Sequence, residues 1–244
     1  MTHRIVANIP KASDDVLYGR ECRELFTVPE GKALIGCDAS GLENRLLAHY
    51  MNDPEYINVV STGDCHEFNR EMAGLETRTQ AKTFLYALVY GAGNLKIGRI
   101  IGGTENEGKR LKSQFMKNLP SLDILNKKVV QAAERGYIKG LDGRKLPIRN
   151  AYSALNLLLQ SAGAIVMKVA LVILDKSLKC AKLNAKIVGN FHDEFEIEID
   201  DNETDIKKVI KLAENSIKQA GEYFKLKCPL EGKAKSGKNW ADVH

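Results

Sequence analysis

The stretch ALIGCDASGLENRLLAHYMND, residues 33–53, joins a predicted strand to a predicted helix. Its first five residues form a short apolar run of the β type that leads into Asp38, and Ser40 then opens a helical pattern. The apolar positions of that helix are Leu42, Leu46, Leu47 and Tyr50. We therefore expect the Asp38 carboxylate at the carboxyl end of a strand, where the backbone holds it rigidly.

A second aspartate, Asp193, stands between two further strand-like segments. Residues 185–191 and 195–199 have β-type patterns, and His192-Asp193-Glu194 lies between them at an expected hairpin tip. Two carboxylates placed in this way can bridge a pair of Mg²⁺ ions about 3.5–4 Å apart, as in metal-dependent phosphoryl transfer. Spacing alone favours two ordinary turn aspartates, and the sequence does not show that they meet in space.

A third segment, 77–89, contains no Gly or Pro and predicts a helix of about three turns that stops at a glycine-rich break. Four residues recur on it every four positions and so form one stripe: Arg78, Lys82, Tyr86 and Tyr90. Cations suit phosphate oxygens and aromatic rings suit base faces, so the stripe could hold a nucleoside triphosphate. The alternative, which these residues favour without context, is an exposed basic turn followed by two core tyrosines.

Several other polar residues have simple structural interpretations. Ser40 and Glu43 match the S-x-x-E pattern of a capping box, so Glu43 by itself predicts a helix start. His66 follows a polar stretch and is expected at the surface. Asn156 and Gln160 lie four apart on an otherwise apolar helix, where they need partners in the core or in the minor groove of a bound duplex.

The remaining pattern predicts helices and one hairpin. The expected elements are one or two basic amphipathic helices over 109–135 broken near Pro120, a hairpin over 138–148 turning at Asp142-Gly143, a long apolar helix over 154–179 and a final amphipathic helix over 203–224.

The 244 residues (27.1 kDa) suffice for one large domain or two small ones, and ordinary apolar and charged fractions exclude wholesale disorder. The net charge of +5 is unevenly distributed. Residues 109–149 contain eleven basic residues against three acids, whereas 193–205 contain eight acids and no base. This polarity suits a protein that holds a polyanion on one surface and cations at another, although a solvated charged face explains any single run.

The five cysteines are scattered and never spaced as C-x-x-C, so neither a disulfide framework nor a zinc site is indicated, and a reducing cytoplasm fits. No signal peptide is recognisable near the start. Residues 157–174 have the length of a membrane span but include Gln160, Ser161 and Lys168, which favours a buried helix.

Taken in order, these segments resemble the family A DNA polymerases, most closely the bacteriophage replicative branch. The resemblance covers nearly the whole chain and is carried by five ordered motifs and the carboxyl terminus: CDASGLENRLLAHYMND (37–53), RTQAKTFLYALVYGAG (78–93), GLDGRKLPIR (140–149), NLLLQSAGA (156–164), NFHDEFEIE (190–198) and KNWADVH (238–244).

The resemblance implies an α+β fold, with a palm made of an antiparallel sheet and packed helices, and mainly helical fingers. The expected division is 1–52 palm, 53–137 fingers and 138–244 palm. The thumb and exonuclease are expected to be absent, since only 37 residues precede Asp38, and MTHRIVANIP (1–10) lacks the Gly-Arg that normally stands before it. Tyr152 stands where larger bacterial members carry arginine. A split gene or a truncated chain would explain this.

The resemblance also implies roles for individual residues. The metal-binding set would be Asp38, Asp193, the carbonyl of Ala39 and, in support, Glu194, holding two Mg²⁺ ions. The nucleotide-binding set would be Arg78, Lys82, His66, Tyr86, Tyr90 and Glu43, with Glu43 excluding a ribose 2′-hydroxyl and Lys82 also catalytic. The DNA-binding set would be Asn156, Gln160, His192, Arg144 and Lys145.

The expected function is template-directed DNA synthesis, with attack of a primer 3′-oxygen on a deoxynucleoside triphosphate. The expected partners are primer–template DNA, dNTPs and a separately encoded thumb and exonuclease chain, without a membrane, in the cytoplasm of a host. One alternative is a non-catalytic DNA-binding remnant, against which the presence of Asp38, Asp193 and Lys82 argues. Another is a single-subunit RNA polymerase, against which Glu43 argues.

Overall fold

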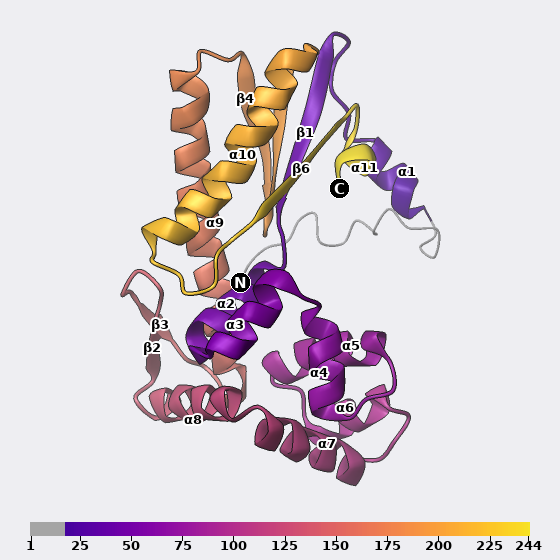
Figure 1. Ribbon diagram of the computed structural model, residues 1–244, viewed down its shortest axis with the longest axis vertical. Coiled ribbons are helices and arrows are strands. Elements are labelled where there is room, and N and C mark those ends of the chain that lie inside the picture. Colours follow the sequence, from indigo (N-terminus) through magenta and orange to yellow (C-terminus); the bar gives the residue numbers. More distant parts are fainter. Residues whose placement is uncertain (1–17) are drawn as a thin grey trace. The chain divides into compact units, whose positions relative to one another are not determined.

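The computed structural model describes residues 18–244, so the N-terminal match at 1–10 lies outside the described residues. The chain divides into two compact units (Figure 1). The sheet unit comprises the described residues up to 42 together with 163–225 and 229–244, and the helical unit comprises 43–162 and 226–228. Each unit is described by itself below.

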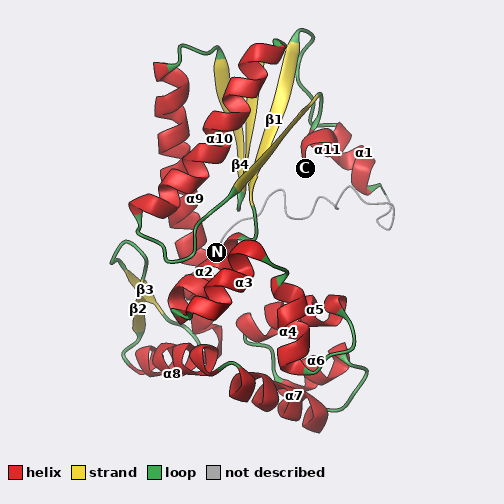
Figure 2. Ribbon diagram, in the orientation of Figure 1, coloured by secondary structure: helices red, strands yellow, loops and turns green. Residues whose placement is uncertain are grey.

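The sheet unit is built on four antiparallel strands in the order β4-β5-β1-β6 (Figure 2). Their bounds are β1 Lys32–Ala39, β4 Ala185–Phe191, β5 Glu194–Asp200 and β6 Gly232–Gly237. The predicted strands on either side of Asp193 are thereby confirmed, and they pair as a hairpin with Phe191 opposite Glu194. The antiparallel sheet confirms the expected palm-like part of an α+β fold.

One face of this sheet packs against α10, Glu203–Tyr223, which Asn202 caps at its N-terminus. Alternate residues of β1 and β5 point to this face in register, with Ile35 opposite Ile197 and Cys37 opposite Phe195, and all four are fully buried. The period of two in each strand therefore places one set of residues in the core.

The other face of the sheet is covered near β1 by two short helices, α1 Gly19–Glu24 and α11 Trp240–Val243. The approach is close at Gly36, where an added Cβ would lie 2.8 Å from Cγ2 of Val243. Leu34, Trp240 and Val243 form a small apolar cluster there. The residues of β1 and β5 that alternate with the core residues point to this second face. Because the two short helices cover part of it, not all of these residues face solvent.

The helical unit contains most of the helices of the chain. Their bounds are α2 Leu42–Met51, α3 Pro54–Thr62, α4 Cys65–Ala73, α5 Arg78–Val89, α6 Asn94–Ile100, α7 Glu105–Asn118, α8 Pro120–Glu134, the 3₁₀ turn Ala151–Ser153 and the first turns of α9, Ala154–Cys180. A small hairpin, β2 Tyr137–Lys139 with β3 Lys145–Pro147, completes it. The predicted helices, the break at Pro120 and the hairpin are confirmed.

Local capping explains where several of these helices begin. The Thr77 and Gln80 side chains form a reciprocal capping box at α5, and Thr104 and Glu107 form another at α7. Asp64 caps α4 by accepting hydrogen bonds from two backbone amides. Each of these signals lies within four residues of its helix start.

The apolar helix over 151–180 is the one described segment that is long and apolar enough to cross a membrane. Half of its most apolar stretch is buried inside the protein. Helices of this length and composition also occur in protein cores.

Candidate active site

Asp38 and Asp193 meet at one end of the sheet. Asp38 lies near the end of β1 and is opposite Glu194 on β5 and Lys233 on β6. The backbone N–H of Ala39 donates to the carbonyl of Asp193 at 2.8 Å, which fastens the hairpin tip to the end of β1. The tertiary structure thus brings together two aspartates that are 155 residues apart in the sequence.

The electrostatics of this end of the sheet are strongly negative. Asp38 is exposed to solvent at the strand end, but the surrounding protein still removes part of its water. This partial desolvation, followed by the charges of Asp193 and Glu194, raises the pKa of Asp38 to about 6, whereas His244 and Lys233 act in the opposite direction. A raised pKa means that the ionised form of Asp38 lacks a sufficient positive partner. The pair is therefore arranged to gain from a bound cation.

The turn between β4 and β5 is tight and places His192 in the left-handed region, with φ 59°. Non-glycine residues adopt this conformation uncommonly, and it recurs at functional turns. The His192 Nδ1 lies 3.1 Å from Oδ1 of Asp193. The turn therefore places the His192 and Asp193 side chains at the end of the sheet where β1 ends.

Glu194 is the most buried of the predicted site residues that carry an ionisable side chain, with 4% of its surface exposed. Its Oε1 accepts a hydrogen bond from Nε1 of Trp240 at 3.1 Å, and its Oε2 lies 2.5 Å from Nδ1 of His244. Burial raises the pKa of Glu194, but the hydrogen bonds from His244 and Trp240, with the neighbouring Glu196 acting in the same direction, outweigh burial and hold the pKa below its ordinary value. Glu194 is thus an ionised carboxylate, hydrogen-bonded within the protein, on the strand next to Asp38.

Glu196 lies two residues further along β5 and is equally buried. Burial, followed by the interaction with Glu194 and its charge, raises the pKa of Glu196 to about 10, so Glu196 is protonated at neutral pH. Neither of its carboxyl oxygens has a hydrogen-bond partner among the described residues. Arg23 of α1 stacks over the Trp240 ring, with its guanidinium carbon 4.4 Å from the centroid. A buried polar network therefore supports the two-aspartate end of the sheet.

Glu196→Gln should stabilise the protein relative to the native chain by an amount that grows as pH rises from about 5 to about 9. Glu196 keeps its proton in the folded state up to about pH 10 and loses it near its ordinary value when unfolded. The stability that protonated Glu196 contributes is complete below its ordinary pKa and is lost as pH rises from there towards 10. Glutamine keeps the size of the Glu196 side chain but does not titrate. Melting temperatures across this pH range measure the difference.

Glu194→Gln is the contrasting variant. It removes the charged acceptor of Trp240 and His244 and should destabilise the fold by about 1–3 kcal/mol at neutral pH. A melting-temperature difference for Glu196→Gln that stays constant with pH would contradict the protonated state of Glu196.

In the helical unit, the predicted stripe of α5 faces solvent opposite a buried face that includes Phe84 and Leu88. Arg78 Nε lies 2.5 Å from Oδ2 of Asp64, the N-cap of α4. Tyr86 is half-buried and Tyr90 is 45% exposed, with their ring centroids 6.2 Å apart. The alternative of two core tyrosines is therefore wrong, and both rings border a surface that carries cations.

His66 corrects an expectation from its polar surroundings, because it is buried, with 9% of its surface exposed. Its ring centroid lies 6.4 Å from that of Tyr86. Burial, then the charges of Arg78 and Lys82, lowers the pKa of His66. Its neutral ring thus adjoins the predicted nucleotide stripe, and the fold of α4 against α5, rather than its neighbours in sequence, places it there.

Glu43 accepts hydrogen bonds from two other predicted residues. The Tyr90 hydroxyl donates to its carboxylate at 3.1 Å and 3.3 Å, and Gln160 Nε2 donates to its Oε1. One turn earlier on α9, the side-chain oxygen of Asn156 is buried with no hydrogen-bond partner among the described residues. The Glu43 carboxylate is thus held by side chains from two other helices.

The hairpin residues lie at an exposed turn of the same unit. Arg144 Nε donates to Oδ2 of Asp142 at 2.7 Å, and Lys145 Nζ lies 4.8 Å from the Tyr137 ring centroid. Both cations are exposed to solvent.

The donors at the end of the sheet suit a hard cation such as Mg²⁺, which binds through one or two carboxylates and keeps several waters. Among residues 18–244 no group of three or more His, Cys, Asp or Glu side chains is arranged to hold a metal ion. The two aspartates carry negative charge that nearby cations do not balance. Together with the main-chain carbonyl of Ala39, they fit an ion that would also be bound by substrate phosphates.

Sequence reasoning did not assign Arg23, Glu196, Trp240 or His244 to the site. In the sequence, apolar residues of β5 alternate with Glu196 and Glu198, and this local pattern does not indicate that α11 covers the glutamate face. The carboxyl-terminal likeness KNWADVH was the available signal, because it contains the Trp and His that bind Glu194.

An antiparallel sheet that ends in two aspartates and, in the other unit, a helix that carries cations and tyrosines are the features expected of the polymerase class that the motifs predict. The family model described as "DNA polymerase family A" matches residues 4–242. The chain belongs to DNA polymerase family A, as its motifs predict.

Three relatives show the extent of the likeness. A protein of Escherichia phage Phieco32 named "DNA-directed DNA polymerase" is 32% identical over 99% of this chain and 53% of its own length, and that of Escherichia phage T7, with the same name, is 36% identical over 93% and 37%. The solved "POL domain of Pol1 from M. smegmatis complex with DNA primer-template and dNTP" superposes with TM-score 0.85 and 26% identity, over 97% of this chain and 44% of that one. The chain thus spans about half or less of the relatives it matches.

Proposed function

We propose that this chain catalyses template-directed DNA synthesis, transferring a nucleotidyl group from a dNTP to a primer 3′-hydroxyl. The observation that carries the proposal is the meeting of Asp38 and Asp193 at one end of the sheet, where partial desolvation and mutual repulsion raise the pKa of Asp38. Membership of family A gives this acidic end its chemical context.

Asp38, Asp193 and the carbonyl of Ala39 would hold Mg²⁺, two ions in our proposal, with Glu194 in support. Bound Mg²⁺ activates the attacking 3′-oxygen and stabilises charge on the reacting phosphate and leaving group. Glu194 is bonded to Trp240 and His244, so we assign it to positioning the strand end and reinforcing the negative charge that attracts the ions.

The α5 stripe would bind the incoming nucleotide. Arg78 and Lys82 would bind its phosphates, and Lys82 would also stabilise developing charge and donate a proton to the leaving pyrophosphate. His66 would contact the triphosphate as a neutral donor. Tyr86 would stack on the nucleotide, and Tyr90 would guard the templating position while holding Glu43 in place to exclude a ribose 2′-hydroxyl.

The remaining predicted residues would contact primer and template. Asn156, Gln160 and His192 would lie near the primer terminus, and Arg144 and Lys145 would bind phosphates. In this proposal residues 1–52 and 138–244 form the palm and 53–137 the fingers, and the protein acts in the cytoplasm of a host.

Primer extension tests the proposal against a non-catalytic DNA-binding remnant. The chain is incubated with a hairpin primer–template, dNTPs and Mg²⁺, and incorporation is measured with and without a chelator. We expect chelator-sensitive extension directed by the template. Retained DNA binding without any incorporation would favour the remnant.

A further inference from the structure

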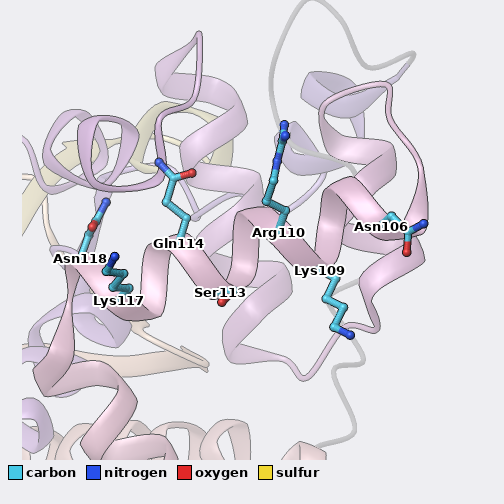
Figure 3. Close-up of a pocket in the computed structure, with 7 residues that line it drawn as sticks. All are labelled: Asn106, Lys109, Arg110, Ser113, Gln114, Lys117 and Asn118. Atoms are coloured by element: carbon cyan, nitrogen blue, oxygen red, sulfur yellow. The ribbon is translucent and has the colours of Figure 1, made fainter.

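The outer face of α7 carries an unusual concentration of unpaired positive charge. A shallow hollow of about 690 Å³ runs along it, and all the lining side chains come from this one helix (Figure 3). Three are cations and four are uncharged polar residues: Lys109, Arg110 and Lys117, with Asn106, Ser113, Gln114 and Asn118. We call these seven residues the α7 surface.

The α7 surface is separate from the proposed nucleotide site. The inner face of α7 packs on α6, where an added Cβ at Gly108 would lie 2.0 Å from the carbonyl oxygen of Asn94. Phe115 of α7 stacks edge-to-face on Phe84, from the buried side of α5, with centroids 5.1 Å apart. The cations of α7 therefore project away from the face of α5 that carries the predicted stripe.

The charge pattern of α7 differs from that of the other exposed helices. Lys127, Lys179, Lys207 and Lys208 each form an ion pair with an acid three or four residues earlier on their own helix. Within the part of the chain that the structure describes, none of the three α7 cations forms an ion pair. No acid occurs from 108 to 122. The preceding Glu107 feels the charge of Arg110, but its carboxylate accepts its hydrogen bonds from Thr104 at the capping box and forms no ion pair with Arg110. An ordinary solvated face would mix both signs.

We infer that the α7 surface binds the phosphate backbone of single-stranded nucleic acid, which under the proposed function is unpaired template. Cations interspersed with amide and hydroxyl side chains are the groups that contact phosphate oxygens and sugars. The surface has no apolar or aromatic side chain, whereas a docked protein segment usually needs a buried apolar anchor. From Asn106 to Asn118 the helix runs about 18 Å, enough to follow several phosphates.

The test measures binding of a fluorescein-labelled dT oligonucleotide by anisotropy across a range of salt concentrations. The test variant is Lys109→Ala/Arg110→Ala/Lys117→Ala, and the matched control is Lys179→Ala/Lys207→Ala/Lys208→Ala, which removes the same charge from α9 and α10. All six positions are exposed helix sites where alanine is well tolerated, and circular dichroism checks the helix content. We expect the control to bind more than tenfold more tightly than the test variant.

The slope of log K against log salt should also fall by about 2 in the test variant, because each single-strand phosphate contact contributes about 0.7. On a hairpin primer–template, the loss should be confined to substrates with a long 5′ extension. Equal dT binding by both variants would overturn the inference. Tighter binding of a labelled oligoglutamate peptide than of dT, lost in the test variant, would overturn it in favour of a protein partner.

The inference and the proposed function fail in different ways. If the native chain extends primers while both variants bind dT alike, the α7 surface is not a nucleic-acid site and the proposed function stands. If the native chain binds dT through α7 but never extends a primer, the surface stands and the proposed function fails.

Discussion

Asp193→Asn should reduce single-turnover nucleotide incorporation by a factor on the order of 10³ or more, while binding of primer–template is retained. Asparagine keeps the size and hydrogen-bonding capacity of the side chain but removes its charge. Asp193 contributes to the raised pKa of Asp38, so its charge belongs to the acidic pair that would hold the metal ions. The loss should therefore appear in the chemical step.

The matched control for this prediction is Asp175→Asn. Asp175 is an exposed aspartate of α9 whose ion pair is with Lys179, so the same chemical change there should leave incorporation within about twofold of the native rate. The measurement is rapid-quench primer extension at saturating dNTP, with DNA affinity measured separately. Turnover by Asp193→Asn within tenfold of the native rate would contradict its metal-binding role.

Glu43→Ala should raise the use of ribonucleotides relative to deoxynucleotides by about 10²-fold in kcat/KM. The Glu43 carboxylate is held in place by the Tyr90 hydroxyl and the Gln160 amide, so it can act as a fixed obstacle rather than a mobile side chain. A pocket rejects an added hydroxyl efficiently only when the group that blocks it cannot move aside. The ratio of incorporation efficiencies for matched rNTP and dNTP pairs measures the effect.

Tyr90→Phe gives the graded control, because it removes one of the bonds to Glu43 and leaves the ring. Its sugar discrimination should lie between those of the native chain and Glu43→Ala. Tyr86→Phe should leave 2′-hydroxyl discrimination unchanged. An unchanged rNTP to dNTP ratio in Glu43→Ala would show that the Glu43 carboxylate does not exclude the 2′-hydroxyl.

Much of the local structure could be predicted because its causes lie within a few residues. The capping signals at Thr77 and Thr104, the Asp142-Gly143 turn and the alternation of β5 each depend on short-range backbone geometry. The family was predictable for another reason: five motifs in order are a distributed signal, and the family match over 4–242 confirms them.

The roles of the named site residues remain predictions, but their placement is a matter of tertiary structure. Nothing near His66 in the sequence indicates burial, which comes from packing of α4 against α5. Nothing near Glu196 indicates a raised pKa, which comes from the cover that α11 places over its face of the sheet. In each case the environment is supplied by residues distant in sequence, which local patterns do not encode.

The sequence by itself determined that this chain is a family A polymerase segment with strands, helices and turns where its periodicities and caps lie. Only the tertiary structure decided that Asp38 and Asp193 share one end of a sheet, that a buried Glu194–Glu196 pair with Trp240 and His244 supports them, and that the three cations of the α7 surface form no ion pair with any described residue. The physical reason is that the hydrogen bonds of helix caps and tight turns are set by neighbours in the chain, whereas burial and electrostatic fields are set by neighbours in space.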